Sequence, residues 1–216
     1  MKTLKKLTAL VLVIAALLTS LVGCGKSPLK DYEIDESNED KRFYYVAMAV
    51  KNHGIIIVEL DAKYAPITVA NFVKLVREGF YDGLTFHRVI EGFMIQGGDP
   101  NADGTGGSDE TIIGEFLYNG WYNGIPHERG VISMARSDDY DSASSQFFIC
   151  NASTGNVGAL DHNYAAFGHV VEGMDVVDSI TSTTAKYGDS NGTIAKKNKQ
   201  AVITEMKVVV YNKNEK

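Results

Sequence analysis

From Phe43 onward the chain consists mainly of short apolar stretches with the two-residue period of β-strands, separated by glycine-rich turns. Many short strands with few helices are typical of a closed barrel or of a sandwich of two sheets. Periodicity alone therefore predicts a mostly-β domain over residues 43–212 and leaves these two architectures open. The stretches that we expect to form strands are 42–50, 54–61, 85–90, 93–98, 131–136, 145–150, 165–171 and 201–211.

Two segments have the period of an amphipathic helix instead. In APITVANFVKLVREG (65–79), apolar residues recur every three or four positions, Pro66 suits the first turn and Gly79 suits the end. The second segment, GMDVVDSI (173–180), predicts a short helix late in the chain. We therefore expect two helices to accompany the strands.

The N-terminus has the features of an export signal. Lys2, Lys5 and Lys6 precede an apolar stretch over residues 7–22, which is shorter than the ~20 residues that span a membrane. The stretch ends in LVGC, which resembles the processing box of bacterial lipoproteins. The resemblance implies that residues 1–23 are a signal peptide and that Cys24 carries a lipid anchor. An ordinary secretory signal with a chance cysteine is the alternative.

Residues 24–42 are polar and acidic and show no apolar period. We expect a solvated tether that holds the domain off the membrane, with an acidic partner-binding tail as the alternative. If Cys24 is acylated, Cys150 has no disulfide partner. Because Cys150 ends the apolar stretch SQFFIC, we expect a buried structural thiol there.

Several kinds of function are disfavoured by what the sequence contains. The net charge of −6 argues against general nucleic-acid binding, which needs a basic surface. There is no GxSxG nucleophile motif, and DGTGGSDE (103–110) lacks the Gly-Lys-Ser/Thr of a phosphate-binding loop. The five histidines show no metal-ligand spacing, so we expect no metal.

The stretch FHRVIEGFMIQGGDP (86–100) alternates like a strand, yet it carries polar residues that a core strand would not bury without partners. Met94 and Gln96 share one face of this strand, as Gln146 and Phe148 share a face of another. Such apolar and amide pairs can hold a peptide, although interior packing with satisfied amides explains them equally well. Gly97 and Gly98 indicate a bulge or tight turn.

Four motifs together resemble the cyclophilin type of peptidyl-prolyl cis–trans isomerase: FHRVIEGFMIQGGDP, GVISMAR (130–136), SASSQFFIC (142–150) and LDHNYAAFGHV (160–170). The likeness runs from about residue 44 to 211. It implies an eight-stranded antiparallel closed barrel capped by two α-helices, which we assign to residues 43–216. It also implies an enzyme that rotates Xaa–Pro bonds in polypeptides without a cofactor. Strict alternation places Phe93 and Met94 on opposite faces, so a bend near Glu91 and Gly92, or a geometry specific to the family, is needed to bring them together.

The resemblance assigns roles to particular residues. The catalytic arginine is Arg88, and His87 flanks the site without acting as its base. Tyr164 stands where the family has a histidine at the rim of the pocket. The apolar proline pocket is assigned to Phe93, Met94, Phe148 and Leu160. Contacts with the substrate backbone are assigned to Gln96, Ala135, the main chain around Arg136, and Gln146. Taken singly, these residues are more often surface, core or hydrogen-bonded structural residues than parts of a binding site, so the assignments depend on their joint occurrence.

A second departure from the family concerns inhibitor binding. The family's tryptophan before the Leu-Asp pair is Ala159 here, and in eukaryotic relatives that indole binds cyclosporin. We therefore expect weak cyclosporin binding. The single tryptophan, Trp121, lies in another loop and is no substitute.

The favoured hypothesis is a monomeric prolyl isomerase, anchored by lipid at the outer face of a bacterial membrane, that assists the folding of exported proteins. One alternative is a cyclophilin-like module that binds proline-containing peptides as a chaperone or adaptor with little turnover. The other is an unrelated β-barrel lipoprotein that binds small molecules. No nucleic-acid partner is expected.

Overall fold

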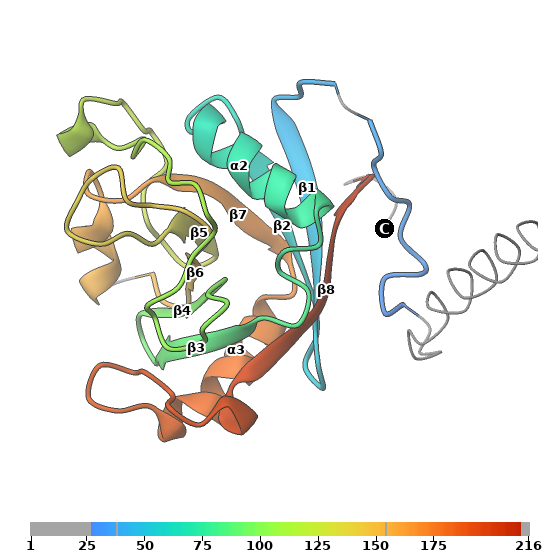
Figure 1. The fold of residues 1–216 in the computed structure, drawn as a ribbon, viewed down its shortest axis with the longest axis vertical. Helices are drawn as coiled ribbons and strands as arrows, with labels where there is room; N and C mark the ends of the chain where they lie inside the picture. Colours follow the sequence, from blue (N-terminus) through green and yellow to red (C-terminus); the bar gives the residue numbers. More distant parts are fainter. Residues whose placement is uncertain (1–26, 38, 154, 213–216) are drawn as a thin grey trace, which may run out of the picture.

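The computed structural model of the chain describes residues 27–37, 39–153 and 155–212. In this part, eight strands close into an antiparallel barrel in the order β1-β2-β7-β5-β6-β4-β3-β8 (Figure 1). The barrel prediction is thereby confirmed over the sandwich, and each expected stretch contains a strand. The strands are β1 (Phe43–Val50), β2 (Gly54–Asp61), β3 (Thr85–Ile90), β4 (Met94–Gly97), β5 (Val131–Met134), β6 (Phe147–Cys150), β7 (Ala166–Glu172) and β8 (Ala201–Val209).

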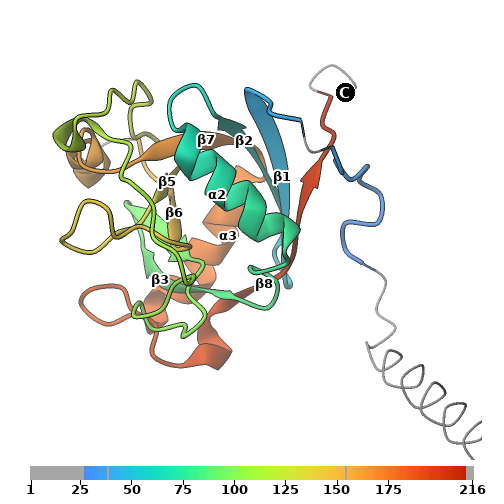
Figure 2. The ribbon, with the colours of Figure 1, turned by 45° about the horizontal axis from the view of Figure 1, so that its top comes forward.

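The two expected helices are α2 (Pro66–Arg77) and α3 (Met174–Thr184), at opposite ends of the barrel (Figures 1 and 2). Helix α2 begins at Pro66 as predicted. It ends where Gly79 adopts a φ of +71°, a conformation that glycine takes without strain. The amide of Gly79 donates to Val76 O and the amide of Phe80 to Leu75 O, which is the Schellman arrangement. Short 3₁₀ turns are η1 (Leu117–Asn119), η2 (Gly155–Leu160), η3 (Ala185–Tyr187) and η4 (Lys197–Lys199).

The barrel interior is filled by aromatic and branched side chains from alternate strand positions. Phe147 of β6 is fully buried there and packs edge-to-face against Phe72 of α2 and against Phe86 of β3. Ile95 and Ile149, which are paired across β4 and β6, also belong to this core. Because alternate residues face opposite sides, their neighbours Met94, Gln96 and Phe148 lie on the outer face of the barrel.

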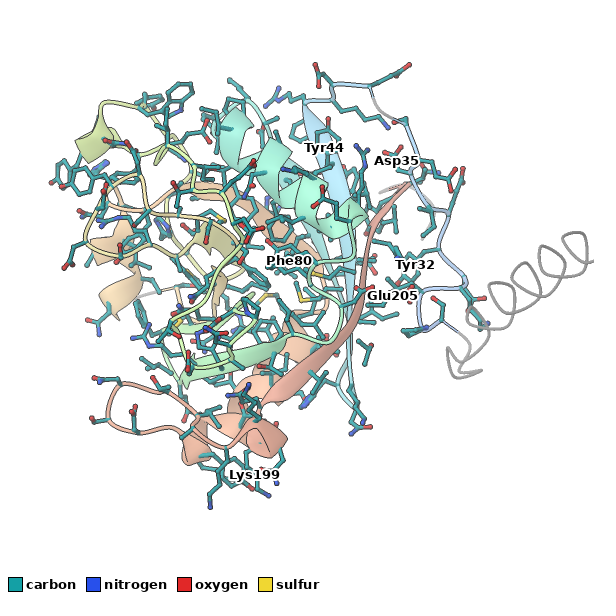
Figure 3. The ribbon with its side chains drawn as sticks, in the orientation of Figure 1. Tyr32, Asp35, Tyr44, Phe80, Lys199 and Glu205 are labelled. Carbon is teal, nitrogen blue, oxygen red and sulfur yellow. The ribbon has the colours of Figure 1, made fainter. Side chains whose placement is uncertain are left out.

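The segment 27–37 lies along the outside of β1 and β8, away from β3, β4 and β6 (Figures 1 and 3). Leu29 is 2% exposed and packs with Ala47, Ala49 and Val209. Backbone hydrogen bonds join Asp35 N to Val208 O and Val210 N to Glu33 O. The prediction of a solvated tether is wrong for these residues, because the small side chains of β1 leave an apolar hollow that Leu29 fills.

The predicted signal peptide, residues 1–23, and the predicted lipid attachment site at Cys24 lie outside the described residues. None of the helices within the described ranges is long and apolar enough to span a membrane.

Candidate active site

Three neighbouring strands align the polar side chains that looked misplaced in the sequence. Arg88 of β3 is paired with Gln96 of β4, and Gln96 is paired with Phe148 of β6. Residues directly opposite in antiparallel strands share a face, so these three side chains form one row on the outside of the barrel. The row crosses the hairpin of β3 and β4 and continues onto β6, which comes much later in the chain, and it sets the direction of a groove.

A β-bulge at His87 explains how Arg88 reaches this row. Phe86 pairs with Gly97 and Arg88 pairs with Gln96, so His87 is an extra residue on β3. A bulge turns the next side chain relative to strict alternation. Phe86 is thereby buried in the core while both His87 and Arg88 line the groove.

The Arg88 guanidinium is held at two of its nitrogens. Its Nε donates to the carbonyl of Asn191 at 2.8 Å, and its Nη1 donates to Oε1 of Gln96 at 3.1 Å. Within the described part of the chain, Nη2 has no hydrogen-bond acceptor. Burial lowers the pKa of Arg88, but a guanidinium remains protonated at neutral pH. The site therefore contains an oriented cation with donors available to a ligand.

A chain of amides continues from Arg88. Gln96 Nε2 donates to Gln146 Oε1 at 2.9 Å, and Gln146 Nε2 donates to the carbonyls of Gly104 and Gly106 at 3.1 and 2.7 Å. The buried carboxylate of Asp99 holds the loop that supplies these carbonyls. It accepts hydrogen bonds from three backbone N–H groups of the loop, those of residues 101, 103 and 104. The amides are thus satisfied within the groove wall and oriented along it.

Beside the arginine, an apolar cluster forms on the outer face of β4 and β6. Met94, Phe148 and Leu160 are buried within it, and Phe93 and Tyr164 pack at its edge. Phe93 lies in the turn before β4, where Gly92 has a φ of +73°, and this is the predicted bend that brings Phe93 beside Met94. Tyr164 packs edge-to-face on Phe148, so an aromatic ring forms this side of the pocket.

Two adjoining hollows make up the groove. The first, of about 360 Å³, holds the guanidinium and the apolar cluster. The second, of about 330 Å³, extends past Gln146 to the serines at 108, 137, 142 and 144. Gln96, Gly104, Ala135 and Arg136 line both. The structure brings together all ten residues that the resemblance placed at the site, together with His87: Arg88, Phe93, Met94, Gln96, Ala135, Arg136, Gln146, Phe148, Leu160 and Tyr164.

His127 supports the pocket from behind, a role that its place in the sequence did not indicate. Its ring stacks on Phe148 at 6.0 Å, while Nδ1 lies 2.9 Å from Asp161 and Nε2 lies 2.9 Å from Ser133. Ser133 follows six residues later on β5, whereas Asp161 comes from the loop after η2, 34 residues along the chain. The arrangement fixes the ring that forms the floor of the pocket.

Burial sets the protonation of the groups around the groove. It lowers the pKa of His87, whose two ring nitrogens have no hydrogen-bond partner among the described residues. It also lowers the pKa of His127 against the opposing effect of Asp161. Cys150 is fully buried, as expected, and burial raises the pKa of its thiol to about 12. Among the described residues, no three His, Cys, Asp or Glu side chains are grouped to hold a metal.

The fold and site define a β-barrel protein with an external groove that combines a fixed arginine with an apolar cluster. Residues 45–208 match the family model described as "Cyclophilin type peptidyl-prolyl cis-trans isomerase/CLD". The chain belongs to this family, and the class of enzyme expected from the motifs is confirmed.

The relatives agree with this assignment. A peptidyl-prolyl cis-trans isomerase of Helicobacter pylori is 44% identical over 155 residues, which cover 71% of this chain and 89% of that protein. Peptidyl-prolyl cis-trans isomerase A of Dickeya dadantii is 45% identical over 130 residues, covering 59% of this chain and 66% of that protein. A crystal structure of a Cryptosporidium parvum cyclophilin superposes with a TM-score of 0.67 at 26% identity, covering 79% and 99% of the two chains.

Proposed function

We propose that this chain accelerates the rotation of Xaa–Pro bonds in exported polypeptides at the outer face of a bacterial membrane, with Arg88 as its catalytic residue. The observation that carries the mechanism is the guanidinium itself, fixed through Nε and Nη1 beside the apolar cluster of Met94, Phe148 and Leu160. A second crystal structure of the C. parvum protein was determined in the presence of the dipeptide Ala-Pro, which supports a proline ligand for the equivalent groove here.

The chemistry requires only positioning and charge. An Xaa–Pro amide exchanges slowly because its C–N bond has partial double-bond character. In the twisted transition state this conjugation is lost, and a lone pair localises on the prolyl nitrogen. A donor aimed at that nitrogen stabilises the transition state more than the planar ground state, and only such differential binding raises the rate. Arg88 supplies the donor.

The remaining side chains hold the substrate while one half of it turns. Phe93, Met94 and Phe148 surround the proline ring with apolar surface, and the Gln96 amide binds the backbone beside it. No proton is transferred in this reaction, so His87 is not required as a base. Its lowered pKa keeps the imidazole neutral next to the cation.

The test compares catalysis with binding. The full chain, purified in detergent, is assayed for exchange of an Ala-Pro tetrapeptide alongside Arg88→Ala and Arg42→Ala. Arg42 is an exposed arginine paired with Asp61, remote from the groove. We expect Arg88→Ala to lower kcat/KM by about 10²–10³, the usual effect of removing one transition-state donor, and Arg42→Ala to have no effect. An inactive wild type that still binds the peptide would establish the adaptor function instead.

The membrane location depends on the N-terminal sequence, whose basic residues, apolar stretch and LVGC box support a lipid on Cys24. Cells that express the chain are grown with radiolabelled palmitate. We expect label in the wild-type protein and none in Cys24→Ser. Export of an unlabelled, soluble wild-type protein would show that the segment is an ordinary secretory signal.

A further inference from the structure

Apolar side chains gather on the surface of one loop beside the groove. Within residues 113–122, Ile113, Leu117, Tyr118, Trp121 and Tyr122 are all exposed, with Tyr122 77% and Tyr118 60% accessible. Tyr140 of the neighbouring loop is exposed as well. We call these six residues the aromatic patch. Exposed apolar patches on soluble domains usually mark interaction sites, and tyrosine and tryptophan are enriched at such sites.

The loop that carries the patch is held in place at both sides. The buried carboxylate of Glu115 accepts hydrogen bonds from the amides of Ile67 and Thr68, at 2.9 and 2.8 Å, and so caps α2. On the other side, Asp141 Oδ1 accepts hydrogen bonds from Gly114 N and Asn119 Nδ2. The exposed rings are therefore presented on a fixed backbone, which lowers the entropy cost of binding.

The patch is continuous with the substrate groove through Arg136. The guanidinium of Arg136 lies 4.9 Å from the Tyr164 ring, which lines the pocket, and 4.8 Å from the Tyr140 ring, which belongs to the patch. It also lies 5.2 Å from the Phe116 ring, beneath the same loop. Figures 1 and 2 show the 112–125 and 137–145 loops side by side next to β5 and β6. A polypeptide that leaves the pocket past Tyr164 meets the patch next.

Acidic side chains border this surface. Asp138 and Asp139 are exposed in the turn before Tyr140. Rim charges of this kind favour partners of opposite sign. We propose that the aromatic patch binds the flank of the same unfolded polypeptide whose proline occupies the groove, and that it prefers flanks with apolar and basic residues. This inference rests on the proposed isomerase function and extends the substrate from a proline dipeptide to a longer unfolded segment.

The first test separates short substrates from long ones. The variant Tyr118→Ser/Tyr122→Ser is compared with a matched variant of exposed aromatics elsewhere, Phe43→Ser/Tyr187→Ser, after circular dichroism shows that both are folded. Both are assayed on an Ala-Pro tetrapeptide and on the proline-limited refolding of a reduced, alkylated protein. We expect the patch variant to keep full tetrapeptide activity and to lose at least about fivefold in refolding catalysis, the scale of removing an aromatic anchor. The control variant should lose neither.

Equal refolding catalysis by all three proteins would overturn the patch assignment while leaving the isomerase intact. Failure of the wild type on the tetrapeptide would instead contradict the proposed function, so the two outcomes are distinguishable. Concentration-dependent dimerisation that is abolished by the patch variant would also overturn the proposal, because the patch would then bind a second copy of the chain.

The second test uses Trp121, the one tryptophan in the sequence, as a reporter within the patch. Two tryptophan-free peptides share an Ala-Pro centre; one has flanks of leucine, phenylalanine and lysine, the other of serine and glutamate. We expect the first to shift the emission of Trp121 and to bind about tenfold more tightly, and the second to leave the emission unchanged. The patch variant should bind the first peptide more weakly than the wild type does, so that the difference in affinity between the two peptides becomes smaller. An identical response to both peptides in the wild type would contradict the stated preference.

Discussion

The Nη1 of Arg88 and the Oε1 of Gln96 are joined by a 3.1 Å hydrogen bond between directly paired residues of β3 and β4. The same arginine is held from the other side by the carbonyl of Asn191, 103 residues away in the chain. These two acceptors leave the guanidinium little freedom to rotate. Gln96 therefore has two functions in the proposed mechanism, because it contacts substrate and also orients the catalytic cation.

Replacing Gln96 with alanine should release one side of the Arg88 guanidinium. We expect kcat/KM for an Ala-Pro tetrapeptide to fall about 10- to 100-fold, which corresponds to the ~1.5–3 kcal/mol of a hydrogen bond to a charged group. The matched control is Asn191→Ala, which retains the backbone carbonyl that binds Arg88 Nε. Comparable losses in both variants would show that the loop around Asn191, rather than the Gln96 bond, controls activity.

Part of this site was predictable because it follows from alternation along single strands. Met94 with Gln96, and Gln146 with Phe148, were assigned to shared faces from their two-residue spacing, and the structure places all four on the walls of the groove. Gly79 at the end of α2 was also predictable from local sequence, because a helix end often needs a residue that adopts a positive φ without strain. The roles of these residues came from the family motifs and not from periodicity.

Other features depend on how a strand meets its neighbouring strands and loops, and they leave no pattern along a single strand. The bulge at His87 exists only relative to β4, and the support of Phe148 by His127 requires Ser133 and Asp161 to meet in space. Leu29 lies in a polar, acidic stretch that shows no apolar period. Its burial requires the hollow over Ala47 and Ala49, which is formed when β1 joins the closed barrel.

The free energy of unfolding should decrease in mild acid. Burial lowers the pKa of His53, His87 and His127 in the folded chain. The unfolded chain, with histidine pKa values near ~6.5, binds more protons below that pH. Stability should therefore be highest above pH ~6.5 and fall as the pH drops toward the lower folded values. Urea unfolding between pH 7.5 and 5 measures this slope.

The variant His87→Gln provides the control for the pH dependence, since glutamine does not titrate in this range. Its slope should be shallower than that of the wild type, and its isomerase activity should stay close to wild type because His87 is not a base. A steep loss of activity with unchanged binding would instead assign His87 to the catalytic step.

Cyclosporin should bind weakly, because the exposed Ala159 offers no indole where eukaryotic cyclophilins have one. Trp121 does not compensate, since its Nε1 donates to Tyr64 O beside the start of α2. The substitution Ala159→Trp should raise cyclosporin affinity by at least about tenfold, as burial of an aromatic anchor commonly does. Competition in the tetrapeptide assay measures it, and tight inhibition of the wild type would contradict the prediction.

Leu29 should hold the 27–37 segment against the barrel. Its side chain is buried, so Leu29→Ala should lower the free energy of detachment by ~2 kcal/mol or more. The matched control in the same segment is Ile34→Ala, because Ile34 is 40% exposed and the change preserves its backbone pairing with Val209.

Hydrogen exchange at the amides of Asp35 and Val210, which bond across this interface, reports detachment directly. We expect faster exchange at both amides in Leu29→Ala and near-wild-type rates in Ile34→Ala. Unchanged protection in Leu29→Ala would show that the backbone pairing alone fixes the segment.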